Sequence, residues 1–589
     1  MQVAEALQIP ARALKLRLRL ENIVFLVAAL LVFWLIALPL LMLLMMSFRV
    51  GTPLNLGPWS IENYVVTYTS VITYQTLLNT LIYAVVSVGL SMLQAIVLAW
   101  LIERTDMPFR SVAWALIILP IGLPSMLSAV AWILLLNPTV GILNVALRDG
   151  LQFLGVHLER GPFNIYTLGG MVFVNSIVGT STFMLVVGAF RMMNRELEDA
   201  AQASGASKWR TFRRVTLGVM LPSLSVAAVY KLASDFNDMD IPLLLGLQER
   251  VFVVSTLIFY SALFRNPPEW ALATAVASPL VLLSLGMTYL YFRVVMTQAR
   301  AQRYATVTGK IIPARRISLG RWRFAAFAAF VLHFIVSTGL PLATLFYASL
   351  LPSYRPPSPE VFEILSFNKY IEIVTRAAFM RQFTNSMILG TITATMTMVL
   401  ALLISWIVVR ARTRGRFLLD ACVFVPYVLP GSVIAIGLMF TYLNPSFRWI
   451  PVYGSIWILA LGMGVGGLPF ATRLLNGALS QVHTELEEAA RVSGARRLTA
   501  LFRVTLPIVL PTFVTGWLWG FIHGMRSMTV PLMLSNPKTE TLGVLLFHLI
   551  DREGDFSGAA ALGMLLVLMT GIVALVSRRI FVRSLGAEQ

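Results

Sequence analysis

Long apolar runs separated by short polar segments make up most of this chain. An α-helix needs about 20 apolar residues to cross a membrane, and each run approaches or exceeds that length. The pattern predicts twelve spanning helices in two groups of six. The runs begin near Val24, Leu77, Val112, Tyr166, Ser223 and Ala271, and then near Ala325, Ser386, Phe417, Ile456, Pro511 and Ala559.

The composition agrees with this pattern. Hydrophobic residues make up 58% of the chain, charged residues make up only 12%, and the mean hydropathy is +0.79. Soluble globular chains carry about twice that share of charge. We therefore expect an all-α polytopic membrane protein.

Basic residues predict the orientation of the chain. Arg12, Lys15, Arg17 and Arg19 precede the first run, and no small-residue cleavage site follows it. We expect this run to be a retained anchor, with both termini in the cytosol and most of the basic residues on the cytosolic side. The net charge of +19 then reflects topology. Basic residues scattered over short loops do not form a nucleic-acid interface.

The two groups of helices repeat each other. Matched residues lie at one constant spacing, and the spacing shortens only after about 137–164, where the first half has extra residues in an outer loop. The matched pairs include Asn79 with Asn385, Trp100 with Trp406, and Pro124 with Pro430. Two homologous halves of the same orientation form a parallel repeat, and a transport pathway is expected at their interface.

The expected organisation is a first half over 1–298, a basic cytosolic linker over 299–323 and a second half over 324–589. From Arg293 to Arg323 the chain has eight basic residues and no acid, which suits a segment near anionic lipid headgroups. The phrase that ends at Lys310 lacks the first glycine of a phosphate-binding loop. We therefore expect no nucleotide and no cofactor on this chain.

Two polar segments, about 191–222 and about 480–511, carry the same phrase. Acids stand at its start, where they favour a helix dipole, and a glycine follows where a helix cap needs a positive φ. A duplicated helix of this kind predicts two docking sites for two copies of a soluble partner, with an ordinary interfacial helix as the alternative. The predicted contact residues are Leu197, Glu198, Asp199, Ala200, Ala201 and Gly205, and Leu486, Glu487, Glu488, Ala489, Ala490 and Gly494.

The second phrase resembles the signature of the membrane permeases of bacterial binding-protein-dependent ABC importers. That signature is Glu-Ala-Ala, three residues, Gly, nine residues, Ile, one residue and Leu-Pro. The second copy matches at Glu488, Gly494 and Leu506-Pro507, with Val504 for the isoleucine. The first copy departs further, with Asp199 for the glutamate and Gly218 for the proline. These departures suggest unequal contacts with two ATPase subunits.

The resemblance implies a type I importer permease in the bacterial inner membrane. Its expected partners are a homodimer of a cytosolic ABC ATPase, which binds ATP and Mg²⁺, a periplasmic or lipid-anchored solute-binding protein, and membrane lipid. The chain itself is then a transport subunit without catalytic residues. Its fused form and the phrases at 234–237, 241–245 and 304–310 resemble the ferric-iron branch. Thiamine, phosphonate, polyamine and sulfate permeases share much of the pattern, so the cargo stays open.

Ionisable residues in predicted spans are the candidates for the pathway, because such groups are usually functional or paired. One interpretation is an ion pair across the halves that closes a gate. A second is a transient cation site, because carboxylates suit hard metal ions, and a third places these residues in an outer aqueous vestibule. The candidates are Asp235, Asp238 and Asp240 in the first half and His523 and Arg526 in the second.

Two other classes of function fit less well. An ion-coupled secondary transporter would leave the duplicated polar phrase unexplained. An intramembrane hydrolase would need a nucleophile facing a base, and the chain has five histidines and no catalytic phrase. Cys422 is the one cysteine, which excludes a disulfide within the chain and a Cys-based metal site. No resident metal is expected.

Overall fold

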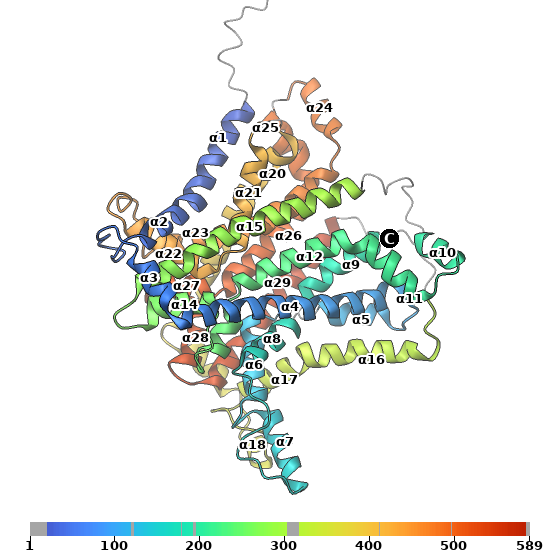
Figure 1. The fold of residues 1–589 in the computed structure, drawn as a ribbon, viewed down its shortest axis with the longest axis vertical. Helices are drawn as coiled ribbons and strands as arrows, with labels where there is room; N and C mark the ends of the chain where they lie inside the picture. Colours follow the sequence, from blue (N-terminus) through green and yellow to red (C-terminus); the bar gives the residue numbers. More distant parts are fainter. Residues whose placement is uncertain are drawn as a thin grey trace, which may run out of the picture.

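The computed structural model describes residues 20–118, 123–177, 180–192, 196–302, 317–411, 413–495 and 497–584. Over these residues it contains helices and isolated β-bridges but no β-strand. Nine of the described helices are long and apolar enough to cross a membrane, and two further bent pairs raise the number to as many as eleven. The expected all-α polytopic membrane fold is therefore confirmed (Figure 1).

The described helices follow one another in two series (Figure 1). The first series is α1 (Leu20–Val32), η1 (Phe33–Ala37), α2 (Leu38–Ser47), α3 (Glu62–Thr69), α4 (Val71–Arg104), α5 (Arg110–Ile118), α6 (Ser125–Leu136), α7 (Ile142–Phe153), α8 (Leu168–Ile177), α9 (Thr180–Met192), α10 (Glu196–Ala203), α11 (Lys208–Thr211), η3 (Phe212–Thr216), α12 (Leu217–Asn237), α13 (Asp240–Gly246), α14 (Val254–Phe259), η4 (Tyr260–Phe264) and α15 (Trp270–Gln302).

The second series is η5 (Gly320–Trp322), α16 (Arg323–Phe334), η6 (Ile335–Gly339), α17 (Leu340–Ser349), α18 (Pro359–Glu363), α19 (Asn368–Thr375), α20 (Phe379–Arg410), α21 (Arg416–Phe424), η7 (Val425–Tyr427), α22 (Gly431–Leu443), α23 (Ile456–Gln481), α24 (Thr484–Val492), α25 (Arg497–Ala500), η8 (Leu501–Thr505), α26 (Leu506–Arg526), α27 (Thr529–Leu534), α28 (Leu542–Asp551) and α29 (Phe556–Ser584).

Several elements of the two series match in length and position. Helices α3 and α19 have 8 residues each, and α12 and α26 have 21 residues each. The π-helical segments η3 and η8 each have 5 residues and stand directly before α12 and α26. The internal repeat read from a few matched residues thus extends to the lengths and positions of these helices.

Three of the twelve predicted runs are not straight helices. The run near Phe417 forms α21 and α22, which meet at 108° around Pro426 and Pro430. Proline lacks a backbone N–H and cannot continue a straight helix. The run near Val112 forms the short helices α5 and α6, and the run near Tyr166 forms the bent pair α8 and α9. The nine helices and two bent pairs among the described residues agree with the predicted fold of about twelve spanning segments.

The first helix of each half packs on the other half. Helix α1 contacts α20 and α21, and α16 contacts α5. Ala326 and Phe330 of α16 lie in one apolar cluster with first-half residues. Helix α2 approaches α22 so closely that a Cβ on Gly437 would meet the Pro39 carbonyl oxygen at 2.8 Å. Each half thus contributes its first helix to the packing of the other half, and these contacts hold the halves together.

The linker region falls mostly outside the described residues. Residues 303–316, which include the rejected phosphate-loop phrase, are not described, and α15 ends at Gln302. Where the description resumes, Ile317 pairs with Thr105 in a short parallel bridge. The backbone N–H of Leu319 donates to Asp106 at 2.8 Å and lowers the pKa of that carboxyl. The predicted boundaries at 298 and 323 stay predictions.

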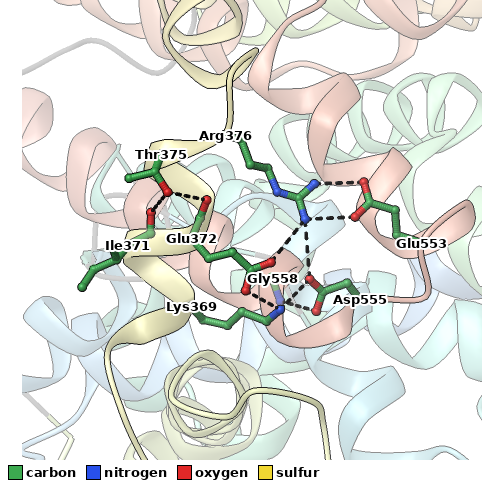
Figure 2. A network of polar contacts seen from close by, with 8 residues as sticks. All are labelled: Lys369, Ile371, Glu372, Thr375, Arg376, Glu553, Asp555 and Gly558. Carbon is green, nitrogen blue, oxygen red and sulfur yellow. Dashed lines mark hydrogen bonds and ion pairs between the residues drawn. The ribbon is translucent and has the colours of Figure 1, made fainter.

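A network of ions joins α19 to the turn between α28 and α29 (Figure 2). Arg376 donates to both carboxylate oxygens of Glu553, at 2.9 and 3.0 Å. Lys369 lies 3.1 Å from Asp555, and Glu372 contacts both basic residues. The first half has Asn63 and Ser70 where Lys369 and Arg376 stand in the second, so this network is a feature of the second half.

Candidate docking helices and interface cavity

Helices α10 and α24 form from the two duplicated polar phrases. In Figure 1, α10 lies at the right-hand edge and α24 at the top. Both helices end in the same way, because Gly205 and Gly494 have φ of +87° and +89°. The next residue donates its N–H back into each helix, at 3.0 Å in both halves. This is the geometry of a glycine-capped helix end.

The exposed side of these helices carries matched leucine and alanine residues with an acid beside them. Leu197 is 48% exposed and Leu486 is 46% exposed. Ala200 and Ala489 are exposed beside them, as are the acids that follow Glu198 and Glu487, while Ala201 and Ala490 are half-buried. A pair of matched apolar patches at helix ends suits the docking of two copies of one partner.

Two of the predicted contact residues point the other way. Glu198 is buried, and its carboxylate accepts a hydrogen bond from the Thr216 hydroxyl at 2.6 Å. Glu487 accepts from the Thr505 hydroxyl at 2.7 Å. These two carboxylates face the membrane helices beneath the docking helices, so they do not belong to the exposed patch.

A cavity of about 320 Å³ lies between the two halves. Its walls come from α6, α8, α12 and α13 of the first half and from α22, α23, α26 and α27 of the second. The cavity brings together four of the five predicted pathway residues, which are Asp235, Asp238, Asp240 and His523. Arg526 does not line it, although it is the last residue of α26.

Each acid in the cavity has its own polar partners. Asp235 forms an ion pair with Lys231, whose Nζ also donates to Asn175 at 3.2 Å. Asp238 accepts a hydrogen bond from the Tyr83 hydroxyl. Asp240 accepts from Ser125 Oγ at 3.1 Å and from Thr529 Oγ1 at 3.2 Å.

Contacts across the halves surround this cavity. Thr529 belongs to the second half, so its hydrogen bond to Asp240 crosses the interface. Tyr230 stacks on Tyr427 with ring centroids 4.4 Å apart. Among the described residues, no ion pair joins Arg526 to the three acids. The halves are therefore joined here by a hydroxyl–carboxylate bond and ring stacking in place of the proposed ion pair.

Comparison with known proteins decides the family. The model of the binding-protein-dependent transport system inner membrane component matches residues 95–296 and again residues 398–586, which is more than half of the chain. The chain belongs to this family. The permease carries the family's domain twice, once in each half, and members of the family are membrane transport components rather than enzymes. The multi-pass fold and the family together place the permease in the inner membrane.

Relatives of the permease differ in what their names say they carry. A probable ABC transporter permease protein, y4fN, from Sinorhizobium fredii is 29% identical over 59% of this chain. The Fe(3+)-transport system permease protein FbpB 2 from Haemophilus influenzae is 22% identical over 80% of this chain and 83% of its own length. The sulfate transport system permease protein CysT from Escherichia coli is 26% identical over 34% of this chain and 76% of its own length. The chain spans about 60% of the length of the Sinorhizobium protein.

Several functional candidates of the permease were missed in the sequence. Lys231 stands one helical turn before Asp235, and a lysine at that spacing inside a predicted span was a visible signal of an ion pair. Asn175 and Tyr83 carried no such signal, because they come from distant helices. The partner of Arg473 could not be read from the sequence either. In the second half, Arg473 forms a bidentate ion pair with Asp420, with distances of 2.6 and 3.0 Å.

The acids of the cavity are already engaged by other polar groups. Within the described residues, no group of three or more His, Cys, Asp or Glu side chains could hold a metal ion. Hydroxyl donors and Lys231 already occupy oxygens of the three carboxylates. A bound cation would have to compete with these donors, which favours weak and transient binding.

Proposed function

We propose that this permease is the membrane subunit of an ATP-driven importer and that its cargo is ferric iron. The observation that carries the proposal is the pair of matched docking helices, α10 and α24, on two homologous halves with a polar cavity between them. A solute-binding protein outside would deliver the cargo, and alternation of the two halves would pass it to the cytosol.

The energy source is a separate protein. A homodimer of a cytosolic ABC ATPase would place one subunit on Leu197 and its neighbours and the other on Leu486 and its neighbours. ATP and Mg²⁺ would bind that dimer and not this chain. ATP can shift the permease only as far as the dimer binds one arrangement of the halves more tightly than the other. Both chain termini would lie on the side of the docking helices.

Two observations support ferric iron as the cargo. A relative that aligns along 80% of this chain is named as an Fe(3+)-transport permease. The cavity carries three carboxylates, Asp235, Asp238 and Asp240, and carboxylate oxygens are preferred by hard cations. Their existing hydrogen bonds favour release, which transport requires.

Sulfate is the second candidate cargo. A sulfate permease is among the relatives, and the cavity also holds donors that an oxyanion would accept from, namely Lys231, Ser234 and Thr529. Purification of the tagged permease in mild detergent, with its ATPase and binding protein, separates the candidates. Iron on the recovered binding protein supports the proposal, and bound sulfate replaces the cargo. Uptake that persists without ATP but needs a proton gradient would reject the importer and support a secondary transporter.

A further inference from the structure

Two arginines at the ends of long spans reach the docking segments in the same way. Arg104 is the last residue of α4 and donates from Nη2 to the carbonyl oxygen of Phe190 at 3.1 Å. Arg410 is the last residue of α20 and donates from Nη2 to the carbonyl oxygen of Leu479 at 2.9 Å. These carbonyls belong to α9 and α23, the helices that lead into the docking segments. Each arginine thus joins two spans at the point where the chain leaves them.

The same arginines face the glutamates on the inner side of the docking helices. Arg104 lies 3.9 Å from the Glu198 carboxylate, and Arg410 lies 3.4 Å from the Glu487 carboxylate. The two side chains are 4% and 7% exposed in the first pair and 8% and 16% exposed in the second. Salt therefore screens these ion pairs much less than it screens surface pairs.

Each glutamate also connects to the span that leaves the docking segment. Thr216 donates to Glu198 and is the last residue of η3, directly before α12. Thr505 donates to Glu487 and is the last residue of η8, directly before α26. We call Arg104, Glu198 and Thr216 the first clasp and Arg410, Glu487 and Thr505 the second clasp. Helices α12 and α26 carry Asp235 and His523 into the cavity.

We propose that the two clasps transmit movement of the docking helices to α12 and α26, and so to the cavity. This inference rests on the proposed docking of an ATPase. π-Helical segments inside helices are frequent at functional sites, and η3 and η8 lie between each docking helix and its span. Thr216 and Thr505, at the ends of η3 and η8, bind the docking helices directly. Each hydrogen bond therefore connects a docking helix to the start of its span without relying on the π-helical segment between them. A displacement of Glu198 or Glu487 then pulls on the start of the span itself.

The repetition of both clasps distinguishes this role from chance packing. The first-half and second-half hydrogen bonds differ by 0.1 Å at threonine and by 0.2 Å at the arginine–carbonyl contact. The docking phrases themselves differ at Asp199 and Glu488 and beyond Val215 and Val504. Hydrogen bonds to a charged carboxylate are about twice as strong as neutral ones. Both halves therefore keep the same donors and the same carboxylate on the inner side of the docking helix.

The test uses a cysteine reporter in the cavity. Cys422→Ser removes the native thiol, and Ser234→Cys places a thiol on the cavity wall. The rate of its reaction with a water-soluble maleimide is measured with the ATPase bound, before and after trapping with ATP and vanadate. The test variant carries Thr216→Val and Thr505→Val, which remove both hydroxyls and keep the side-chain shape. The matched control carries Thr216→Ser and Thr505→Ser, which keep both hydroxyls.

The valine variant is expected to retain the ATPase. The change in labelling rate that trapping causes is expected to be smaller than in the parent by a factor of about five or more. The serine variant keeps both hydroxyls and is expected to respond like the parent. A valine variant that responds like the parent overturns the clasp, and so does one that loses the ATPase. If the valine variant does not fold, a variant with Glu198→Gln and Glu487→Gln replaces it. Retention of the ATPase and the nucleotide-driven change in labelling rate are then measured for that variant. A parent protein that binds no ATPase rejects the proposed function instead.

Discussion

Lys231 and Asp235 form an ion pair one helical turn apart on α12, on the wall of the cavity between the halves. Their side chains are 9% and 2% exposed. The second carboxylate oxygen of Asp235 is buried and has no hydrogen-bond partner among the described residues. Asp235 therefore depends on Lys231 to remain charged at this depth.

Lys231→Met should destabilise the permease strongly. Removal of one partner leaves an uncompensated buried charge, which costs about 3–5 kcal/mol. The midpoint of thermal unfolding in detergent measures the loss. The variant Lys231→Met with Asp235→Leu should recover most of this stability, because an apolar pair can replace a buried ion pair. Equal unfolding midpoints for the single variant and the parent would contradict the dependence of Asp235 on Lys231.

Arg526→Glu should impair transport and leave assembly with the ATPase intact. Arg526 is the last residue of α26, which also carries His523 into the cavity with Asp240, and it forms no ion pair with Asp240 among the described residues. Like charges placed together cost several kcal/mol, so uptake should fall about tenfold or more. Uptake in vesicles and retention of the ATPase are the two readouts, and Arg526→Lys is the control that keeps the charge. Parental uptake by Arg526→Glu would remove this residue from the pathway.

Gly494→Trp should weaken docking on the second half. The glycine has φ of +89°, and no atom lies within 4 Å of an added Cβ, so the cost is in the backbone and at the exposed surface. A side chain in the left-handed region costs about 1–2 kcal/mol. Gly89 on α4 also has open space but an ordinary φ, so Gly89→Trp is the matched control. Retention of the ATPase by the Gly494 variant at the parental level would argue against docking at α24.

The bond between Arg376 and Glu553 should contribute little to stability and should weaken with salt. Their side chains are 26% and 42% exposed. Pairs of this exposure contribute about 0.2–1 kcal/mol. A double-mutant cycle with Arg376→Met and Glu553→Gln measures the coupling, first at low and then at high salt. A coupling that does not change with salt would mean that the pair is screened from solvent.

The sequence was sufficient where the signal was local. The capping glycines Gly205 and Gly494 and the acids before them define the docking helices without reference to the rest of the chain. The repeat needed only matched residues such as Trp100 and Trp406. Charge and mean hydropathy were enough to predict a membrane protein, because both are summed over the whole chain and do not depend on which residues touch in the fold.

Features set by distant contacts could not be predicted. The packing of α1 on α20 depends on the assembly of both halves, and so does the hydrogen bond between Thr529 and Asp240. The inward direction of Glu198 depends on the rotation of α10 over Thr216. The breaks at Pro426 and Pro430 were visible as residues, but an apolar run through them gave no sign of a bend of 108°.

Photocrosslinking from the docking helices tests the central claim most directly. A photoreactive residue replaces Leu197 in one protein and Leu486 in another. A third protein carries it at Phe153, the last residue of α7, which is 92% exposed. Helix α7 lies far from α10 and α24 (Figure 1). Irradiation in native membranes, followed by mass spectrometry of the products, identifies the neighbours. Our account predicts an ABC ATPase on Leu197 and on Leu486 and none on Phe153. No ATPase on either leucine would contradict it.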